Sequence, residues 1–197
     1  MKITNLTENS SIYTSNVYLL RGEWNTLQDV NTLIDAGRDP AVIPAINRIN
    51  TGVGKKKIAR VVITHNHYDH ASLVPKIKHR FAPQVYAFSK NVKGVDHILK
   101  NDQQIKLGDS VFEVIHTPFH TTDSVCLYNQ ENRILFSGDT PLFFDSSPSN
   151  VNPEFIKAFQ NIVSKKIETV YGGHGPPITS NCNQRLARTL ERLTLAK

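Results

Sequence analysis

A strand pattern that runs directly into a cluster of histidines constrains this chain more than any other feature. Residues 57–64 form a compact run rich in isoleucine and valine, typical of a strand buried inside a protein. The next six residues, 65–70, read His-Asn-His-Tyr-Asp-His. In a chain with eight histidines this spacing arises by chance on the order of once in a thousand. The sequence therefore predicts a metal-binding loop at the carboxyl end of a buried strand.

The spacing within this loop indicates how its ligands divide. His65 and His67 alternate in extended backbone, point the same way and can bind one ion. Asp69 and His70 fall where the chain turns toward a helix, so they would face a neighbouring position. A closed structural zinc site favours cysteines, whereas histidine and aspartate suit a catalytic site with room for water. We therefore expect a catalytic site, with two ligands from this loop for each of two adjacent metals.

Three distant residues are candidates for the rest of the site. His120, Asp139 and His174 each follow a predicted strand. Each alone is a weak signal, because a single histidine or aspartate in a loop is more often a surface group. Together they place every candidate ligand at the end of a strand, where open sheets gather their functional loops.

The pattern of apolar residues predicts both strands and helices along the chain. Strands are predicted at residues 11–15, 17–20, 32–35, 57–64, 84–88, 111–117, 124–128, 133–137 and 168–171. Helices are predicted at residues 40–50, 71–81 and 91–99, from residue 152 onward, and at 183–196. Grouped strands with helices between them fit two sheets with helices packed outside better than one parallel sheet.

Composition narrows the class of protein. A length of 197 residues with 39% hydrophobic content fills one good-sized core, so we expect a single domain over residues 1–197. No apolar run approaches the roughly 20 residues of a membrane helix, and the first residues lack the apolar core of a secretory signal. We therefore expect a cytoplasmic protein without a membrane partner. The net charge of +6 is scattered, which makes nucleic acid the less favoured partner beside a small-molecule substrate.

Five segments, in the same order, resemble the metallo-β-lactamase superfamily. They are residues 16–20 with 33–37, 65–70, 117–121, 137–140 and 173–175. The resemblance implies an α/β fold, a four-layer αββα sandwich of two mixed β-sheets with helices on the outer faces. It implies two divalent metal ions held by seven ligands: His65, His67 and His120 on one ion, Asp69, His70 and His174 on the other, and Asp139 as the bridge. Zinc is the metal that these ligand types favour, with iron or manganese as alternatives.

The resemblance also implies a reaction, in which a metal-bridging hydroxide attacks an electrophilic centre. Asp69 would have a catalytic role, binding metal and orienting this nucleophile. Asp139 argues against a true β-lactamase, His67 against a flavodiiron-type oxygen reductase, and the short chain after Pro177 against glutathione specificity. We therefore expect a binuclear hydrolase similar to glyoxalase II or the lactonases, acting on a small carboxylic thioester, ester or lactone. The alternatives are a phosphodiesterase acting on a small nucleotide or nucleic acid, and a non-catalytic metal-binding member of the fold.

Two departures from the family pattern bear on turnover. Residues 71–73 read Ala-Ser-Leu where relatives have glycines, and Phe119 stands where relatives have glycine. Phe119 would reshape the pocket floor or shift His120. Phe143 and Phe144 follow Asp139 and are candidates for an apolar pocket wall, although ordinary packing explains them equally well. Trp24 is a further substrate-binding candidate, because relatives carry a hairpin near the substrate in that loop.

Overall fold

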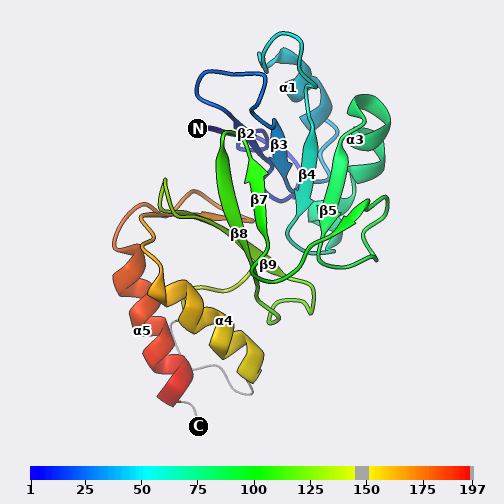
Figure 1. The fold of residues 1–197 in the computed structure, drawn as a ribbon. Coiled ribbons are helices and arrows are strands. Elements are labelled where there is room, and N and C mark those ends of the chain that lie inside the picture. The colour runs from blue at the N-terminus through cyan, green and yellow to red at the C-terminus, as the bar shows by residue number, and fades with distance from the viewer. Residues whose placement is uncertain (145–150, 196–197) are drawn as a thin grey trace.

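Two β-sheets packed face to face form the centre of the molecule (Figure 1). The computed structural model describes residues 1–144 and 151–195. The first sheet has the strand order β1-β2-β3-β4-β5-β6, and the second has the order β11-β10-β9-β8-β7. We call them the N-terminal sheet and the C-terminal sheet. The strands of the N-terminal sheet are β1 (Lys2–Asn5), β2 (Tyr18–Arg21), β3 (Thr32–Ile34), β4 (Arg60–Ile63), β5 (Gln84–Ala87) and β6 (His97–Ile98). The strands of the C-terminal sheet are β7 (Gln104–Leu107), β8 (Ser110–His116), β9 (Val125–Asn129), β10 (Ile134–Gly138) and β11 (Thr169–Gly172).

Both sheets are mixed, and their pairing decides which strand ends meet. In the N-terminal sheet β1, β2 and β3 pair antiparallel, whereas β3 through β6 pair parallel. In the C-terminal sheet β7 through β10 pair antiparallel, and β10 and β11 pair parallel. Strands β8, β10 and β11 therefore run in one direction and end at the same edge of their sheet.

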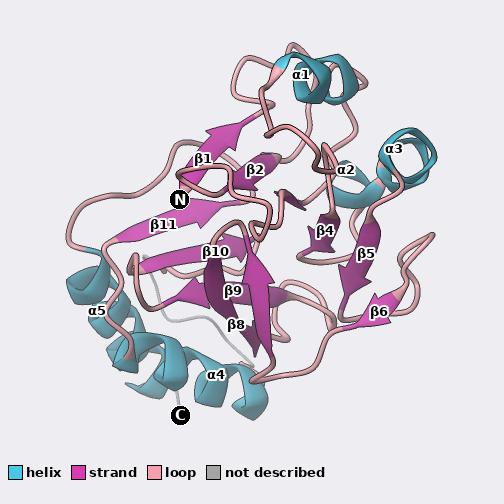
Figure 2. Ribbon diagram, turned by 45° about the horizontal axis from the view of Figure 1, so that its top comes forward, coloured by secondary structure: helices cyan, strands magenta, loops and turns pink. Residues whose placement is uncertain are grey.

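Helices cover the outer face of each sheet (Figure 2). The helices are α1 (Val42–Arg48), α2 (Tyr68–Ala71), α3 (Val74–Phe81), α4 (Pro153–Ser164) and α5 (Cys182–Leu195). Alternate residues of one strand belong to different cores because successive side chains point to opposite faces. Val61 and Ile63 of β4 pack in the core beneath α1 and α3, whereas Val62 packs between the two sheets.

The same alternation builds the other half of the molecule. Leu127 of β9 faces the N-terminal sheet, whereas Cys126 belongs to the third core, which contains Phe155 and Phe159 of α4 and Leu186 of α5. Three cores between four layers confirm the predicted αββα sandwich. Within the described residues, no helix combines the length and the apolar character that crossing a bilayer requires.

Some sequence predictions of local structure are wrong. Residues 11–15 form no strand, and 91–99 are not helical but lead into β6, with Gly94 at a positive φ of 86°. Of the predicted helix over 71–81, residues 74–81 form α3 with Pro75 in its first turn, and Ala71 is the last residue of the separate helix α2. Strands β1 and β7 were not predicted. The final helix is confirmed through residue 195, and its predicted end at Ala196 lies outside the described residues.

Candidate metal centre

The seven predicted ligands lie together at one edge of the sandwich. The loop after β4 and helix α2 carry four of them, and the loops after β8, β10 and β11 carry one each. Strands β8, β10 and β11 run in one direction, so their three loops lie at one edge of the C-terminal sheet. The loop after β4 lies at the same edge of the sandwich, because its ligands are close to theirs. The four ligands from the N-terminal sheet are His65, His67, Asp69 and His70, and the three from the C-terminal sheet are His120, Asp139 and His174.

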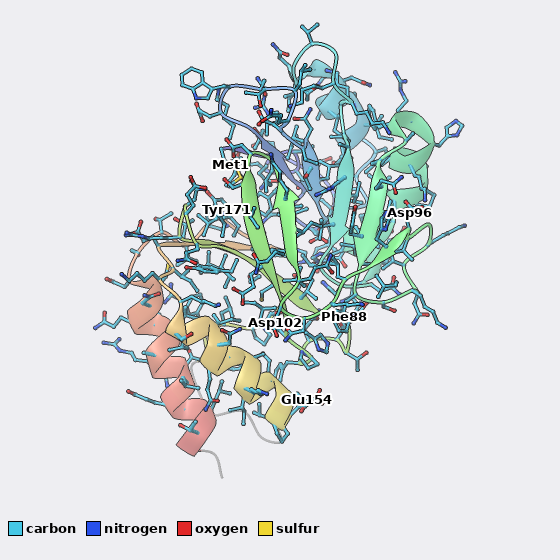
Figure 3. The ribbon with its side chains drawn as sticks, viewed as in Figure 1. Met1, Phe88, Asp96, Asp102, Glu154 and Tyr171 are labelled. Carbon is cyan, nitrogen blue, oxygen red and sulfur yellow. The ribbon has the colours of Figure 1, made fainter. Side chains whose placement is uncertain are left out.

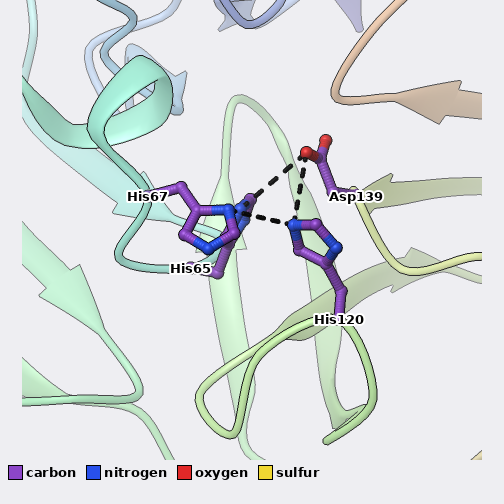
Figure 4. Close-up of side chains that lie close together, drawn as sticks. All are labelled: His65, His67, His120 and Asp139. Carbon is purple, nitrogen blue, oxygen red and sulfur yellow. Dashed lines mark hydrogen bonds and ion pairs between the residues drawn. The ribbon is translucent and has the colours of Figure 1, made fainter.

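Four of these side chains form a first group (Figure 4). His65, His67, His120 and Asp139 each offer one ligand atom, and these atoms all lie within 4.8 Å of one another. His120 Nε2 lies 3.0 Å from His67 Nδ1 and 3.5 Å from Asp139 Oδ2. His65 Nε2 is 3.9 Å from the same Asp139 oxygen. This spacing leaves room for one ion between the four side chains.

The remaining three side chains form a second group. The ligand atoms of Asp69, His70 and His174 also lie within 4.8 Å of one another, and His174 Nε2 is 3.1 Å from Asp69 Oδ2. Asp139 reaches this group as well, with Oδ1 3.3 Å from His70 Nε2 and Oδ2 3.5 Å from His174 Nε2. Its carboxylate therefore lies between the two groups, where a bridging ligand would have to lie.

Several atoms that face the centre are buried without a hydrogen-bond partner. His65 Nε2, Asp69 Oδ2, His70 Nε2 and Asp139 Oδ1 are four of nine such side-chain atoms among the described residues. Leaving a buried polar atom unsatisfied costs about 1–3 kcal/mol, so folded proteins contain few of them. A cation bound between these atoms would satisfy all four. The donor set of imidazoles and carboxylates fits zinc, iron or manganese.

The carboxylates and imidazoles around the centre shift one another's ionisation. Burial lowers the pKa of His65 to about 4, so its ring is neutral. Burial acts in the same direction on His70, but the carboxylates of Asp35 and Asp139 outweigh it and raise this pKa to about 10. Burial opposes ionisation of Asp139, yet the imidazoles of His174 and His70 hold the pKa of its carboxyl well below the usual range. The protein therefore collects negative charge where a cation would bind.

These residues belong to a larger matching region of the chain. Residues 12–174 match the family model described as the metallo-beta-lactamase superfamily. The chain belongs to this superfamily.

Solved structures share the fold. A crystal structure of the B3 metallo-beta-lactamase BLEG-1 superposes with a TM-score of 0.68 at 24% identity, covering 90% of this chain and 94% of that one. The structure of ETHE1 from Myxococcus xanthus gives the same TM-score at 18% identity, covering 98% of this chain and 88% of that one.

Curated relatives of the chain include a hydroxyacylglutathione hydrolase and a thioesterase. The cytoplasmic isozyme of hydroxyacylglutathione hydrolase from Saccharomyces cerevisiae is 34% identical over 119 residues, which cover 55% of this chain and 42% of the relative. An atrochrysone carboxyl ACP thioesterase from Aspergillus fumigatus is 29% identical over 171 residues, covering 81% of this chain and 51% of the relative. The chain therefore spans about half the length of these relatives.

A buried carboxylate behind the superfamily's histidine motif was not predicted as a functional residue. Asp35 follows β3 with a positive φ of 60°, and its Oδ2 lies 2.8 Å from His70 Nδ1. It also accepts hydrogen bonds from the backbone N–H and the hydroxyl of Thr64. The contact between Asp35 and His70 Nδ1 leaves His70 Nε2 facing the metal centre. Carboxylates commonly orient metal-binding histidines in this way. The sequence signal was an aspartate at the end of a strand, directly before Ala36-Gly37.

The departures from the family pattern lie away from the ligand atoms. Phe119 turns into the third core, where its ring centre lies 4.6 Å from that of Phe155. Ala71 and Leu73 pack in the core beneath α1 and α3, and the Ser72 hydroxyl donates to the Tyr68 carbonyl. Phe119, Ala71 and Leu73 therefore serve packing, Ser72 makes a local hydrogen bond, and His120 still reaches its group.

The aromatic candidates for substrate binding divide between the two ends of the sandwich. Phe143 lines a hollow of about 340 Å³ together with His120, Asp139 and His174. Phe144 lies beside it, 5.8 Å from the ring of Phe119.

Trp24 is not brought to the metal centre. Its side chain is 86% exposed in the loop after β2, which runs antiparallel to β3, so this loop lies at the opposite end of the sheet. Met1 marks that end in Figure 3, and its amino group lies 3.6 Å from a carboxylate oxygen of the neighbouring Glu23.

Proposed function

We propose that this protein is a binuclear metal-dependent hydrolase of small carboxylic thioesters. The observation that carries the proposal is the pair of ligand groups joined by Asp139, with four inward-facing buried atoms that lack partners. The relatives named as a hydroxyacylglutathione hydrolase and an ACP thioesterase support a thioester over an ester or a lactone. Zinc is the proposed metal because histidine and carboxylate ligands suit it.

The side chains divide the work of holding and orienting the reactants. Two bound divalent ions would supply a water molecule acidified to near neutral pKa and a Lewis acid for the carbonyl oxygen. Asp139 would hold the two groups at a fixed spacing, and Asp69 would orient the attacking water. Asp35 keeps the His70 ring in one orientation, because its carboxylate contacts the nitrogen that faces away from the centre.

The hollow beside the ligands limits the substrate. Phe143, Leu142 and Ile178 give the hollow an apolar part beside His120 and His174. A hollow of about 340 Å³ is at the lower end of the volumes usual for small-molecule sites. We infer that the acyl group or the thiol arm of a small thioester packs against Phe143.

One observation favours a second candidate, a phosphodiesterase. The guanidinium of Arg185 lies 4.1 Å from the centre of the Phe143 ring. Phe143 also lines a second hollow, next to the one at the ligands, together with Arg185, Arg188 and Arg192. Arginines bind phosphate groups well. A substrate with a phosphate near Phe143 would use them.

A substrate panel combined with metal analysis separates these functions. Protein loaded with zinc, manganese or iron is assayed on a thioester, a lactone and a bis-aryl phosphodiester. The expected result is about two equivalents of metal and hydrolysis of the thioester. His79→Ala removes an exposed histidine of α3 that is not a predicted ligand, and this variant should behave as wild type.

Two outcomes would reject the proposal. Hydrolysis of the phosphodiester alone would transfer the function to the second candidate. Less than one equivalent of metal after careful purification would favour a binding protein without turnover.

A further inference from the structure

Tyr13 lies on the metal centre although it belongs to none of the ligand loops. Its ring stacks on the imidazole of His174, with the ring centres 5.3 Å apart and the planes 17° from parallel. The side chain is 69% exposed, so it stabilises no core. An aromatic residue that is both exposed and stacked on a predicted ligand lies where a substrate would enter.

The backbone around Tyr13 is tied to the loops that carry the ligands. The Ser15 N–H donates to the Asp69 carbonyl at 3.2 Å, and the Asn16 N–H donates to the Gly173 carbonyl at 2.6 Å. On the other side, the Thr14 hydroxyl oxygen accepts from the Arg38 N–H at 2.9 Å. These bonds use the backbone groups that a strand would need, and they fix the position of Tyr13 relative to the second ligand group.

The Tyr13 phenol is a hydrogen-bond donor beside that group. A phenol has an ordinary pKa near 10, so it carries its proton at neutral pH. Its ring stacks on His174, whose Nε2 lies 3.1 Å from Asp69 Oδ2, so the phenol is at the second ligand group.

We propose that Tyr13 is a catalytic residue that donates a hydrogen bond to the oxyanion formed from the substrate carbonyl. This role rests on the proposed thioester hydrolysis. Water adds its oxygen to the carbonyl carbon, the C–S bond breaks, and the thiol leaves with one of the two water protons. The phenol proton stays on Tyr13 throughout, so the residue stabilises the transition state without exchanging atoms.

The test is Tyr13→Phe, which keeps the stacked ring and removes only the hydroxyl. Loss of one oxyanion donor commonly lowers kcat by about 10²–10³-fold. Because Tyr13 is exposed, we expect a fall of about 10–100-fold in kcat, with KM changed less than about twofold. Metal content and melting temperature should equal those of the wild type. Affinity for an unreactive phosphonate analogue of the tetrahedral intermediate, measured by calorimetry, should fall by a similar factor.

Tyr68→Phe is the matched control. Tyr68 is also 69% exposed and lies in the histidine loop, but its ring lies under the guanidinium of Arg38 at 5.1 Å. This variant should retain wild-type kcat and phosphonate affinity.

Each contrary outcome has one meaning. An active wild type with unchanged kcat in Tyr13→Phe would overturn the role of Tyr13 and leave the proposed function standing. Loss of metal in that variant would make Tyr13 structural, which also overturns the role. A wild type inactive on thioesters would overturn the proposed function and this role with it.

Discussion

The two ligand groups of the metal centre differ in how firmly the protein holds them. In the second group His70 is fully buried with Asp35 behind it, and the exposed ring of His174 stacks on that of Tyr13. In the first group His65 is buried, with Thr64 Oγ1 3.2 Å from its Nδ1, but His67 and His120 are exposed. The hydrogen bonds and ion pairs of His67 and His120 among the described residues are with each other and with Asp139. A ligand whose second nitrogen is hydrogen-bonded loses less freedom when it binds a metal. We therefore expect the second group to bind its ion more tightly, and the first to adapt more readily to a substrate.

Removing a ligand from the first group should have the largest effect on activity. His67→Ala should lower thioesterase activity at least 10²-fold, because the first ion loses a direct ligand. About one equivalent of metal should remain, held by the second group. Activity assays together with elemental analysis measure both. Loss of both ions would show that the two groups bind metal as one unit, which would contradict the expected difference in their metal affinity. Wild-type turnover would remove His67 from the site.

Removing the charge of Asp35 behind the second group should have the next largest effect. Asp35→Asn keeps the size of the side chain but removes the charge that holds His70. Metal affinity at the second group should fall about 10–100-fold, as expected for the loss of a partner behind a ligand. Competition with a chromophoric chelator measures this affinity. The control is Asp96→Asn, since Asp96 pairs with Lys78 on the surface. Equal affinity in wild type and Asp35→Asn would contradict the explanation by preorganisation.

The smallest effect is expected from a change in the hollow beside the first group, at Phe143. Phe143→Ala should raise KM about three- to tenfold and leave kcat nearly unchanged, because part of the apolar contact with the substrate is lost while the ligands stay in place. The estimate corresponds to roughly 1 kcal/mol of apolar contact. Steady-state kinetics on two thioesters of different acyl length would check it. An unchanged KM for both would remove Phe143 from the substrate site.

The candidate site was more predictable than its surroundings, and the reason is physical. The ligands follow strands whose apolar patterns are local, so neighbouring residues alone place them at the sheet edge. Asp35 gains its role from a contact with His70, which lies 35 residues away in the chain. The local signal, an aspartate at the end of a strand directly before Ala36-Gly37, does not identify His70 as its partner.

The errors in local structure have similar causes. The segment around Tyr13 has the composition of a strand, but its backbone bonds to Asp69 and Gly173 replace a strand's partners. Strand β1 is a short strand at the edge of its sheet with no fully buried side chain, so its alternation is weak. A substrate role for Trp24 stays a prediction from the comparison with relatives, and the direction of β2 places its loop at the far end of the sheet.

The ligands come from both sheets, and this division ties metal binding to the folding of the chain. An ion that contacts His65 from the N-terminal sheet and Asp139 from the C-terminal sheet can find both only after the sheets have docked. Its binding free energy therefore adds to the free energy of docking, by linkage. Amide hydrogens of β4 and β10, which face each other across the central core, should then exchange with solvent more slowly in the holoprotein than in the apoprotein. A cell short of the metal would hold a chain whose two halves separate more often, and which proteases reach sooner.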